Sequence, residues 1–115
     1  MLVRTDELTG DALCFAVAKL NGYHYFPNGA ALYVHRDTGE RHRSGGYRPD
    51  INWAQAGPII EREKINLSDW ASTWYAKIHR NLSSGSGDTA LIAAMRCFVA
   101  SKLGQVVEVP DELTS

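Results

Sequence analysis

The chain has 115 residues, of which 44% are hydrophobic and 22% are charged, and these values are typical of one globular domain. Its formal net charge of −1 at pH 7 argues against a non-specific nucleic-acid binder, because such proteins need several excess cations to displace counterions from phosphates. No apolar run approaches the roughly 18 residues of a membrane span, and the first residues contain no signal-peptide core. These features favour a cytoplasmic protein.

The residues that most often hold metals or carry out catalysis form no recognisable pattern. Cys14 and Cys97 each lie within an apolar helical pattern, which favours buried, reduced thiols over a disulfide or a zinc site. The histidines show neither HxH nor HExxH spacing, and GxSxG, P-loop and GxGxxG motifs do not occur. We therefore predict no metal, no cofactor and no catalytic residue, and we favour a binding protein over an enzyme.

The first predicted element is a helix from Thr9 to about Leu20. Thr9 can cap its N-terminus, and Leu13 and Val17 belong to an apolar stripe with helical spacing. Gly22 stands where many helices end in a left-handed residue. The stripe indicates that this helix packs on a sheet or on other helices.

A hairpin is predicted after this helix. Residues 23–36 are typical of extended structure with a break at Pro27–Gly29, and the segment Ala31–Arg36 has the β-branched and aromatic content of a strand. Asp37–Glu40 predicts a turn, after which the hairpin would close through Arg41–Arg43.

Positive charge is concentrated between residues 36 and 48. This segment holds four arginines and one histidine against two carboxylates, and it also contains Tyr47 and the sequence Ser44-Gly45-Gly46. Arginine side chains, free backbone amides and an aromatic ring together suit a phosphate-bearing small ligand. A solvated hairpin tip explains the same composition, so both interpretations stay open.

The segment Asn52–Glu63 contains a tryptophan and an amide just before a Gly-Pro pair. Gly57 and Pro58 predict a turn that presents Trp53 and Gln55 at the rim of a loop, where an aromatic ring and an amide can recognise a ligand. The alternative is that the tryptophan is buried and anchors the loop to the core.

From Ile59 the alternation of residues favours a charged edge strand, in which Glu61 and Glu63 share one face. Paired carboxylates on one face are compatible with general acid–base catalysis, which we treat as a minor alternative.

A second helix is predicted from a cap at Ser68 or Asp69 to about Leu82, because aromatic and apolar residues recur there at helical spacing. Its aromatic face either docks the helix on the core or is exposed as an interaction surface. We predict that the chain forms a homo-oligomer through Trp70, Trp74 and Tyr75.

The last third of the chain predicts a flexible linker, a third helix and a short edge strand. Asn81–Gly87 has the composition of a linker, Asp88 can cap a helix over Thr89–Lys102, and Gly104 can end it. The segment Gln105–Val109 then indicates an edge strand. Together these elements predict an α+β fold in one compact domain, residues 1–115, with about three helices packed on a small, mostly antiparallel sheet.

Arg96 falls among apolar residues of the third predicted helix and therefore needs an acceptor. The first choice is a structural ion pair with Glu61, Glu63 or an aspartate, and the second is a phosphate or carboxylate of a ligand.

Several segments resemble one known family. They are Leu8–Leu13, Ala16–Lys19, Trp53–Glu63 and Ala93–Gly104. In these segments the chain is similar to the NinX-like family of small bacteriophage and prophage proteins. The resemblance implies a phage accessory protein in the cytoplasm of a bacterial host, and it supplies no catalytic residue. The chain departs from the family pattern in its Tyr23–Arg43 and Trp70–Tyr75 segments.

Combined with this resemblance, the residues favour a non-catalytic counter-defence protein that captures a small, nucleotide-like anionic ligand. Trp53 or Tyr47 would stack on a base, and amides and arginines would contact its edge and its phosphates. The predicted ligand-binding residues are Arg43, Tyr47, Arg48, Asn52, Trp53, Gln55 and Arg96. The alternatives are inhibition of a host enzyme through the aromatic face, a nucleic-acid accessory role in phage replication or recombination, and a small nucleotide-modifying enzyme.

Overall fold

Three α-helices and eight short strands make up the described part of the chain, which comprises residues 1–27 and 32–114 of a computed structural model. The helices are α1 (Gly10–Leu20), α2 (Trp53–Glu63) and α3 (Ala90–Leu103). The strands are β1 (Leu2–Arg4), β2 (Tyr23–Phe26), β3 (Leu32–His35), β4 (Arg41–Arg43), β5 (Asn66–Trp70), β6 (Thr73–Ile78), β7 (Ser83–Gly87) and β8 (Val106–Glu108). They form three antiparallel sheets, in the orders β1-β8, β2-β3-β4 and β5-β6-β7. The predicted α+β fold is confirmed.

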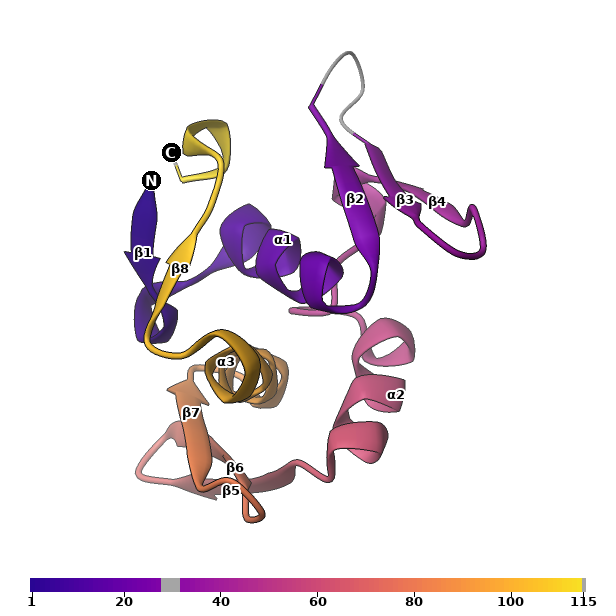
Figure 1. Cartoon of the computed structure of the whole chain (residues 1–115). Coiled ribbons are helices and arrows are strands. Elements are labelled where there is room, and N and C mark those ends of the chain that lie inside the picture. Colours follow the sequence, from indigo (N-terminus) through magenta and orange to yellow (C-terminus); the bar gives the residue numbers. More distant parts are fainter. Residues whose placement is uncertain (28–31, 115) are drawn as a thin grey trace.

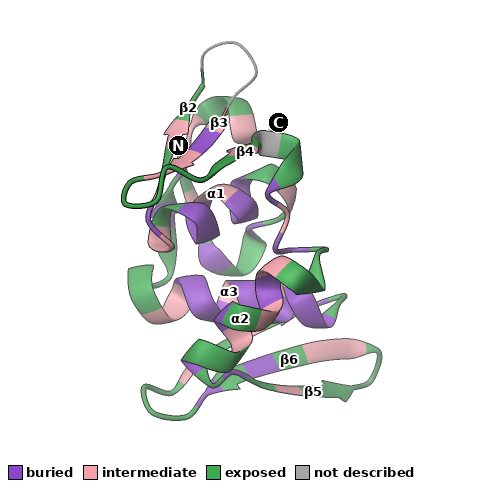
Figure 2. Cartoon of the chain, turned by 90° about the vertical axis from the view of Figure 1, so that its right-hand side faces the viewer, coloured by how far each residue is buried: buried purple, intermediate pink, exposed green. Residues whose placement is uncertain are grey.

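The elements stack along the long axis of a molecule that measures 42 × 28 × 23 Å. The β2-β3-β4 sheet packs on α1, α1 packs on α3, and α3 lies on the β5-β6-β7 sheet, while α2 flanks α3 (Figure 1). Figure 2 shows that most of α1 and α3 is buried, whereas α2 exposes much of its outer side. Within the described residues, none of the helices combines the length and apolar character needed to cross a membrane.

The first and third helices are confirmed, and so are the glycines predicted to end them. Gly22 and Gly104 follow α1 and α3 with φ angles of +90° and +84°, which glycine adopts at little cost. The cap of α3 is Thr89 and not Asp88, since the Thr89 hydroxyl accepts a hydrogen bond from the Ile92 N–H at 3.1 Å. The predicted edge strand after α3 is β8, which pairs with β1.

The predicted hairpin is also confirmed. β3 pairs with β2 on one side and with β4 on the other, and the connection between β3 and β4 is a turn. Part of this prediction lies outside the described residues, namely residues 28 and 29 of the predicted break and Ala31, the proposed start of the strand.

The predictions of a turn at Gly57-Pro58 and of an edge strand from Ile59 were wrong, because both segments belong to α2. The Asn52 side chain caps this helix by accepting hydrogen bonds from the backbone N–H groups of Ala54 and Gln55. Pro58 removes one helical hydrogen bond, but Gly57 has no Cβ to collide with the proline ring. In a helix Glu61 and Glu63 point about 160° apart, and only Glu63 is buried.

The predicted second helix was also wrong. Its residues form the β5–β6 hairpin, whose turn is made by Ala71 and Ser72 with φ angles of 52° and 67°. Two central residues with positive φ match the right-handed twist of a hairpin, and this turn usually contains glycine or asparagine. Ala76 and Ile78 then face α3 with strand periodicity, although the aromatic spacing of this segment also fits a helix.

The predicted flexible linker is largely strand β7, which lies against α3 (Figure 1). A Cβ placed on Gly85 would lie 2.6 Å from the backbone nitrogen of Cys97, and one on Gly87 would lie 2.6 Å from Cγ2 of Ile92. The glycines are therefore required by close contact between the strand and the helix, and they do not indicate flexibility.

Candidate functional site: an aromatic groove beside a cationic cluster

One face of the β2-β3-β4 sheet is aromatic because rings occupy alternate positions of neighbouring strands. Tyr23 lies opposite His35 and Tyr33 lies opposite His42, and directly opposed residues share a face. The ring centroid of Tyr47 lies 5.1 Å from that of Tyr23 and 5.4 Å from that of His42. Tyr33 and Tyr47 are buried, while the other rings remain partly accessible. The face therefore offers several rings for contact with a planar ligand.

Hydrogen bonds fix this aromatic face in place. The Glu40 carboxylate accepts from the Tyr23 hydroxyl at 3.2 Å and from Nε2 of His42 at 3.1 Å. These bonds, with His42 the stronger influence, lower the pKa of Glu40, and burial together with the nearby carboxylate raises the pKa of Tyr23 to about 12. Nδ1 of His35 accepts from the backbone N–H groups of Asp37 and Thr38. The turn between β3 and β4 is thus held by its own histidine.

A groove of about 400 Å³ runs between this face and α2. The aromatic wall includes Tyr23, His42 and Tyr47, and the helix wall includes Gln55 and Arg62. The Gln55 amide accepts a hydrogen bond from the backbone N–H of residue 48 at 2.6 Å and donates one to the carbonyl of residue 46 at 2.8 Å. Gln55 therefore fixes the loop that carries Tyr47 against the start of α2.

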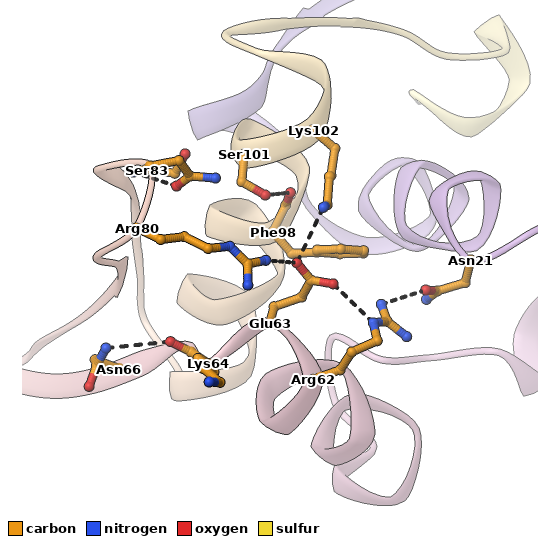
Figure 3. A network of polar contacts seen from close by, with 11 residues as sticks. Asn21, Arg62, Glu63, Lys64, Asn66, Arg80, Ser83, Phe98, Ser101 and Lys102 are labelled. Carbon is orange, nitrogen blue, oxygen red and sulfur yellow. Dashed lines mark hydrogen bonds and ion pairs between the residues drawn. The ribbon is translucent and has the colours of Figure 1, made fainter.

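A cluster of charged side chains lies at the C-terminal end of α2 (Figure 3). The buried carboxylate of Glu63 contacts Arg62 and Arg80 at 2.9 Å each and Lys102 at 3.4 Å. We call these residues the Glu63 cluster. Burial alone would raise the pKa of Glu63, but the hydrogen bonds and charges of Arg62 and Lys102 outweigh it and lower the pKa. The cluster joins α2 to the β6–β7 turn and to the last turn of α3.

A second concavity of about 310 Å³ lies beside the Glu63 cluster and adjoins the groove. Both hollows are lined by Asn21 and Arg62. Figure 3 shows Arg62 between Glu63 and Asn21, and its guanidinium donates to the Asn21 side-chain oxygen at 3.0 Å. Asn21 in turn donates to the Tyr47 hydroxyl at 3.1 Å. An aromatic surface and a cationic surface therefore meet at Asn21 and Arg62.

A larger hollow, about 460 Å³, lies elsewhere, near the start of α1 and the last described residues. Its charged residues are Glu7, Asp11, Arg48 and Met1, which carries the N-terminal ammonium. Both cations already have partners, since Arg48 is paired with a buried aspartate and the Met1 ammonium with Glu108 and Asp111. This hollow is poorly suited to an anion, so we place the candidate site in the aromatic groove.

Only two of the predicted ligand-binding residues, Tyr47 and Gln55, line this groove. Asn52 caps α2, and Trp53 stands in the first turn of the helix, where it is 57% exposed but does not line the groove. Arg43 is exposed on β4, and strand alternation directs it away from the face that carries His42. The binding role of these residues stays a prediction, but they do not form one site.

The two remaining arginines of the predicted site have partners within the protein. Arg48 makes a two-pronged contact with the buried Asp50 at 2.8 and 3.0 Å, and Asp50 also accepts a hydrogen bond from the Cys14 thiol. Burial raises the pKa of Cys14 to about 12 with help from Asp50, so this thiol is protonated at neutral pH. Both cysteines are buried free thiols, as predicted.

The predicted ion pair of Arg96 is wrong. Its guanidinium donates to the backbone carbonyls of Leu8 and Ser86 at 2.9 and 2.8 Å. Glu61 is exposed and Glu63 is engaged by other cations, so neither acts as its partner. Arg96 therefore ties the segment before α1 and strand β7 to α3.

The residues predicted to form an interface divide between two faces of the β5-β6-β7 sheet. Trp74 is partly buried and packs against the core. Trp70 and Tyr75 share the opposite face, because Trp70 pairs with Thr73 and Tyr75 follows two residues later. They are 74% and 41% exposed. The predicted oligomer is not tested by the fold, and it stays a prediction.

Several groove residues were not predicted from the sequence, including Tyr23, Glu40, His42 and Arg62. The alternation of aromatic residues along β2 and β3 gave a signal for the aromatic face, since alternate residues of a strand lie on one side. No local signal places Arg62 in the groove, because the alternation of its segment predicts a strand, whereas Arg62 lies in helix α2. Among the described residues there is no group of three or more histidine, cysteine, aspartate or glutamate side chains arranged to hold a metal.

Comparison with known proteins agrees with the resemblance seen in the sequence. The family model described as "Bacteriophage P22, NinX" matches residues 4–102, a range that contains both walls of the groove and the whole Glu63 cluster. The comparison with curated proteins found no match. Because the family model covers well over half of the sequence, the chain belongs to the NinX family of bacteriophage P22.

Proposed function

We propose that this protein binds a small, nucleotide-like anionic ligand in the groove between the β2-β3-β4 sheet and α2. Membership of the NinX family indicates a phage accessory protein. The observation that supports the finer proposal is that the two hollows adjoin at Asn21 and Arg62, since one is lined by aromatic rings and the other by cations. A nucleotide has the same two parts, a planar base and a charged phosphate.

The groove residues have suitable contacts to offer. Tyr23 and His42 are partly accessible and present ring faces on which a base can stack. Arg62 lines both hollows, and its contacts with Glu63 and Asn21 leave further N–H groups of the guanidinium for a ligand. The amide of Gln55 is engaged at both ends, so it positions the loop of Tyr47 and does not read the base edge.

The biological role that fits such binding is counter-defence in the cytoplasm of the bacterial host. A phage protein that retains a nucleotide signal without converting it lowers the free concentration of that signal. The effect requires a protein concentration above that of the signal and a dissociation constant below it. This role needs no catalytic residue.

Native mass spectrometry of protein purified from infected or signal-producing cells tests this proposal directly. We expect a retained small molecule that absorbs in the ultraviolet and is absent from the His42→Ala and Arg62→Gln variants. Lys77→Gln is the matched control, because Lys77 is exposed on β6 outside both hollows. Circular dichroism checks that each variant is folded. Identical retention by all four proteins would reject the groove as the site.

A second candidate function is contact with a partner protein, supported by the exposure of Trp70 and Tyr75 on one sheet face. Large exposed aromatics are common at the centres of protein interfaces. The partner would be a second copy of this chain or a host enzyme. This surface lies on the face of the sheet opposite α3, so both functions are compatible in one molecule.

A further inference from the structure

The Glu63 cluster contains more positive charge than its single carboxylate can balance. Arg62, Arg80 and Lys102 all contact Glu63, so three cations share one anion. The carboxylate is buried, whereas each cation is about half exposed, with 53%, 53% and 42% of its side chain accessible. Two positive charges are therefore held close together at the surface, where their mutual repulsion favours the binding of an anion.

The hollow beside this cluster has the features of an anion site. Its lining combines Arg36, Arg62 and Lys102 with the apolar side chains of Leu20 and Phe98. The Arg62 guanidinium carbon lies 5.7 Å from the centre of the Phe98 ring, which supports the arginine from one side. Arg36 has only a long contact of 3.7 Å with Asp37, and both side chains are largely exposed. These cations can turn toward a ligand without leaving a buried charge unpaired.

Lys102 is the cation best placed to change partner. Its contact with Glu63 is the longest of the three, at 3.4 Å, and the same carboxylate oxygen is also held by Arg80 at 2.9 Å. Glu63 therefore keeps a close partner when Lys102 moves toward an anion. The lysine ammonium is a compact charge on a flexible chain, which suits contact with a phosphate oxygen.

We infer that this hollow is a subsite for a terminal phosphate monoester, so that the ligand of the groove is a nucleotide with a free phosphate end. The inference rests on the proposed function. A phosphate monoester carries a charge of about −1.5 to −2 at pH 7, which matches the excess of cations over the single carboxylate, Arg36, Arg62 and Lys102 against Glu63, in the lining of the hollow. A phosphodiester carries only one negative charge. The base lies in the aromatic groove, and Arg62 contacts both parts of the ligand.

Isothermal titration calorimetry in a phosphate-free buffer tests the inference with adenosine, AMP, cyclic 3′,5′-AMP and inorganic phosphate. We expect AMP to bind about tenfold more tightly than cyclic AMP, the difference expected for one charge-assisted hydrogen bond, and adenosine to bind more weakly than either. AMP affinity should fall between pH 7.5 and pH 5.5, because its second phosphate ionisation has a pKa near 6 and the monoester loses charge. Adenosine, which lacks the phosphate, measures any change in base binding over the same pH range.

Two variants separate a binding role from a structural one. Lys102→Gln and Arg36→Gln should each weaken AMP binding about tenfold while leaving adenosine binding unchanged, and Lys77→Gln should change neither. Arg36 does not contact Glu63, so its variant remains informative even if loss of Lys102 disturbs folding. Circular dichroism monitors the fold of each protein.

The outcomes distinguish this inference from the proposed function. Equal binding of adenosine, AMP and cyclic AMP would overturn the phosphate subsite and leave the groove intact. Binding of inorganic phosphate and AMP with equal affinity, without binding of adenosine, would support the subsite and reject the groove as a base site. Failure of all four probes to bind would overturn both.

Discussion

Replacement of Gly85 by alanine tests how β7 packs on α3. A Cβ at this position would lie 2.6 Å from the backbone nitrogen of Cys97 and 2.7 Å from the carbonyl oxygen of Ala93. Both atoms belong to the α3 backbone, so the clash cannot be relieved by rotation of a side chain. Strand or helix must shift, and overpacking of this kind costs about 1–3 kcal/mol. We expect Gly85→Ala to lower the free energy of unfolding by an amount near the upper end of this range.

Urea denaturation followed by circular dichroism measures this change, with Gly45→Ala as the matched control. A Cβ on Gly45 would meet no atom within 4 Å, so this variant should stay within about 0.5 kcal/mol of the unmodified protein. The midpoint should fall for Gly85→Ala with little change in slope. Equal midpoints for the two variants would show that residues 81–87 do not pack on α3, and would restore their interpretation as a linker.

Four further outcomes follow from the structure. Folding lowers the pKa values of Asp50 and Glu63 from their ordinary values of 3.8 and 4.5. The stability that these two carboxylates contribute is therefore present at neutral pH and is lost as the pH falls through their folded pKa values. The Asp50→Asn variant should show a smaller decline in unfolding free energy below about pH 4 than the unmodified protein. Trp53→Ala should cost about 0.5 kcal/mol or less, because Trp53 is 57% exposed, and a loss of about 3–5 kcal/mol in denaturation would show that it is buried. Sedimentation should give an oligomer that dissociates in the Trp70→Ser, Tyr75→Ser double variant, and a monomer of unmodified protein at micromolar concentration would contradict this surface. Duplex DNA should bind no more tightly than about 10⁻⁴ to 10⁻⁶ M at physiological salt, and nanomolar binding would favour a nucleic-acid role.

Local patterns predicted α1, α3 and the β3–β4 hairpin because each of these elements carries its own start and stop signals. Gly22 and Gly104, for example, end their helices with the expected positive φ angles. The errors occurred where a local signal had a second meaning. Pro58 usually ends a helix, yet a neighbouring glycine and the Asn52 cap allow α2 to continue. The positive φ angles of Ala71 and Ser72 were not predictable from those residue types.

Glycine in β7 shows the same ambiguity at the level of packing. A run of serine and glycine is typical of a flexible linker, but it also suits a strand that must approach a helix closely. The sequence of residues 83–87 does not distinguish the two cases. The deciding fact is the position of α3 backbone atoms from residues 93 and 97, which only the folded chain supplies.

The candidate site depends on which cations and carboxylates lie next to one another in the folded chain. The composition of a single segment therefore does not predict where the site lies. The arginines at positions 36–48 form the densest cationic segment in the sequence, yet of Arg36, Arg43 and Arg48 only Arg36 lines the hollow, since Arg48 is balanced by a buried aspartate and Arg43 faces away from the groove. Further unbalanced charge comes from Arg62, Arg80 and Lys102, which are separated by many residues and meet at one carboxylate. A cation recruits a ligand only when the fold does not already supply its counterion. An anion site is therefore best judged by comparing the number of cations with the number of carboxylates around a hollow, and the excess of cations beside Glu63 is the feature that supports the phosphate subsite we propose.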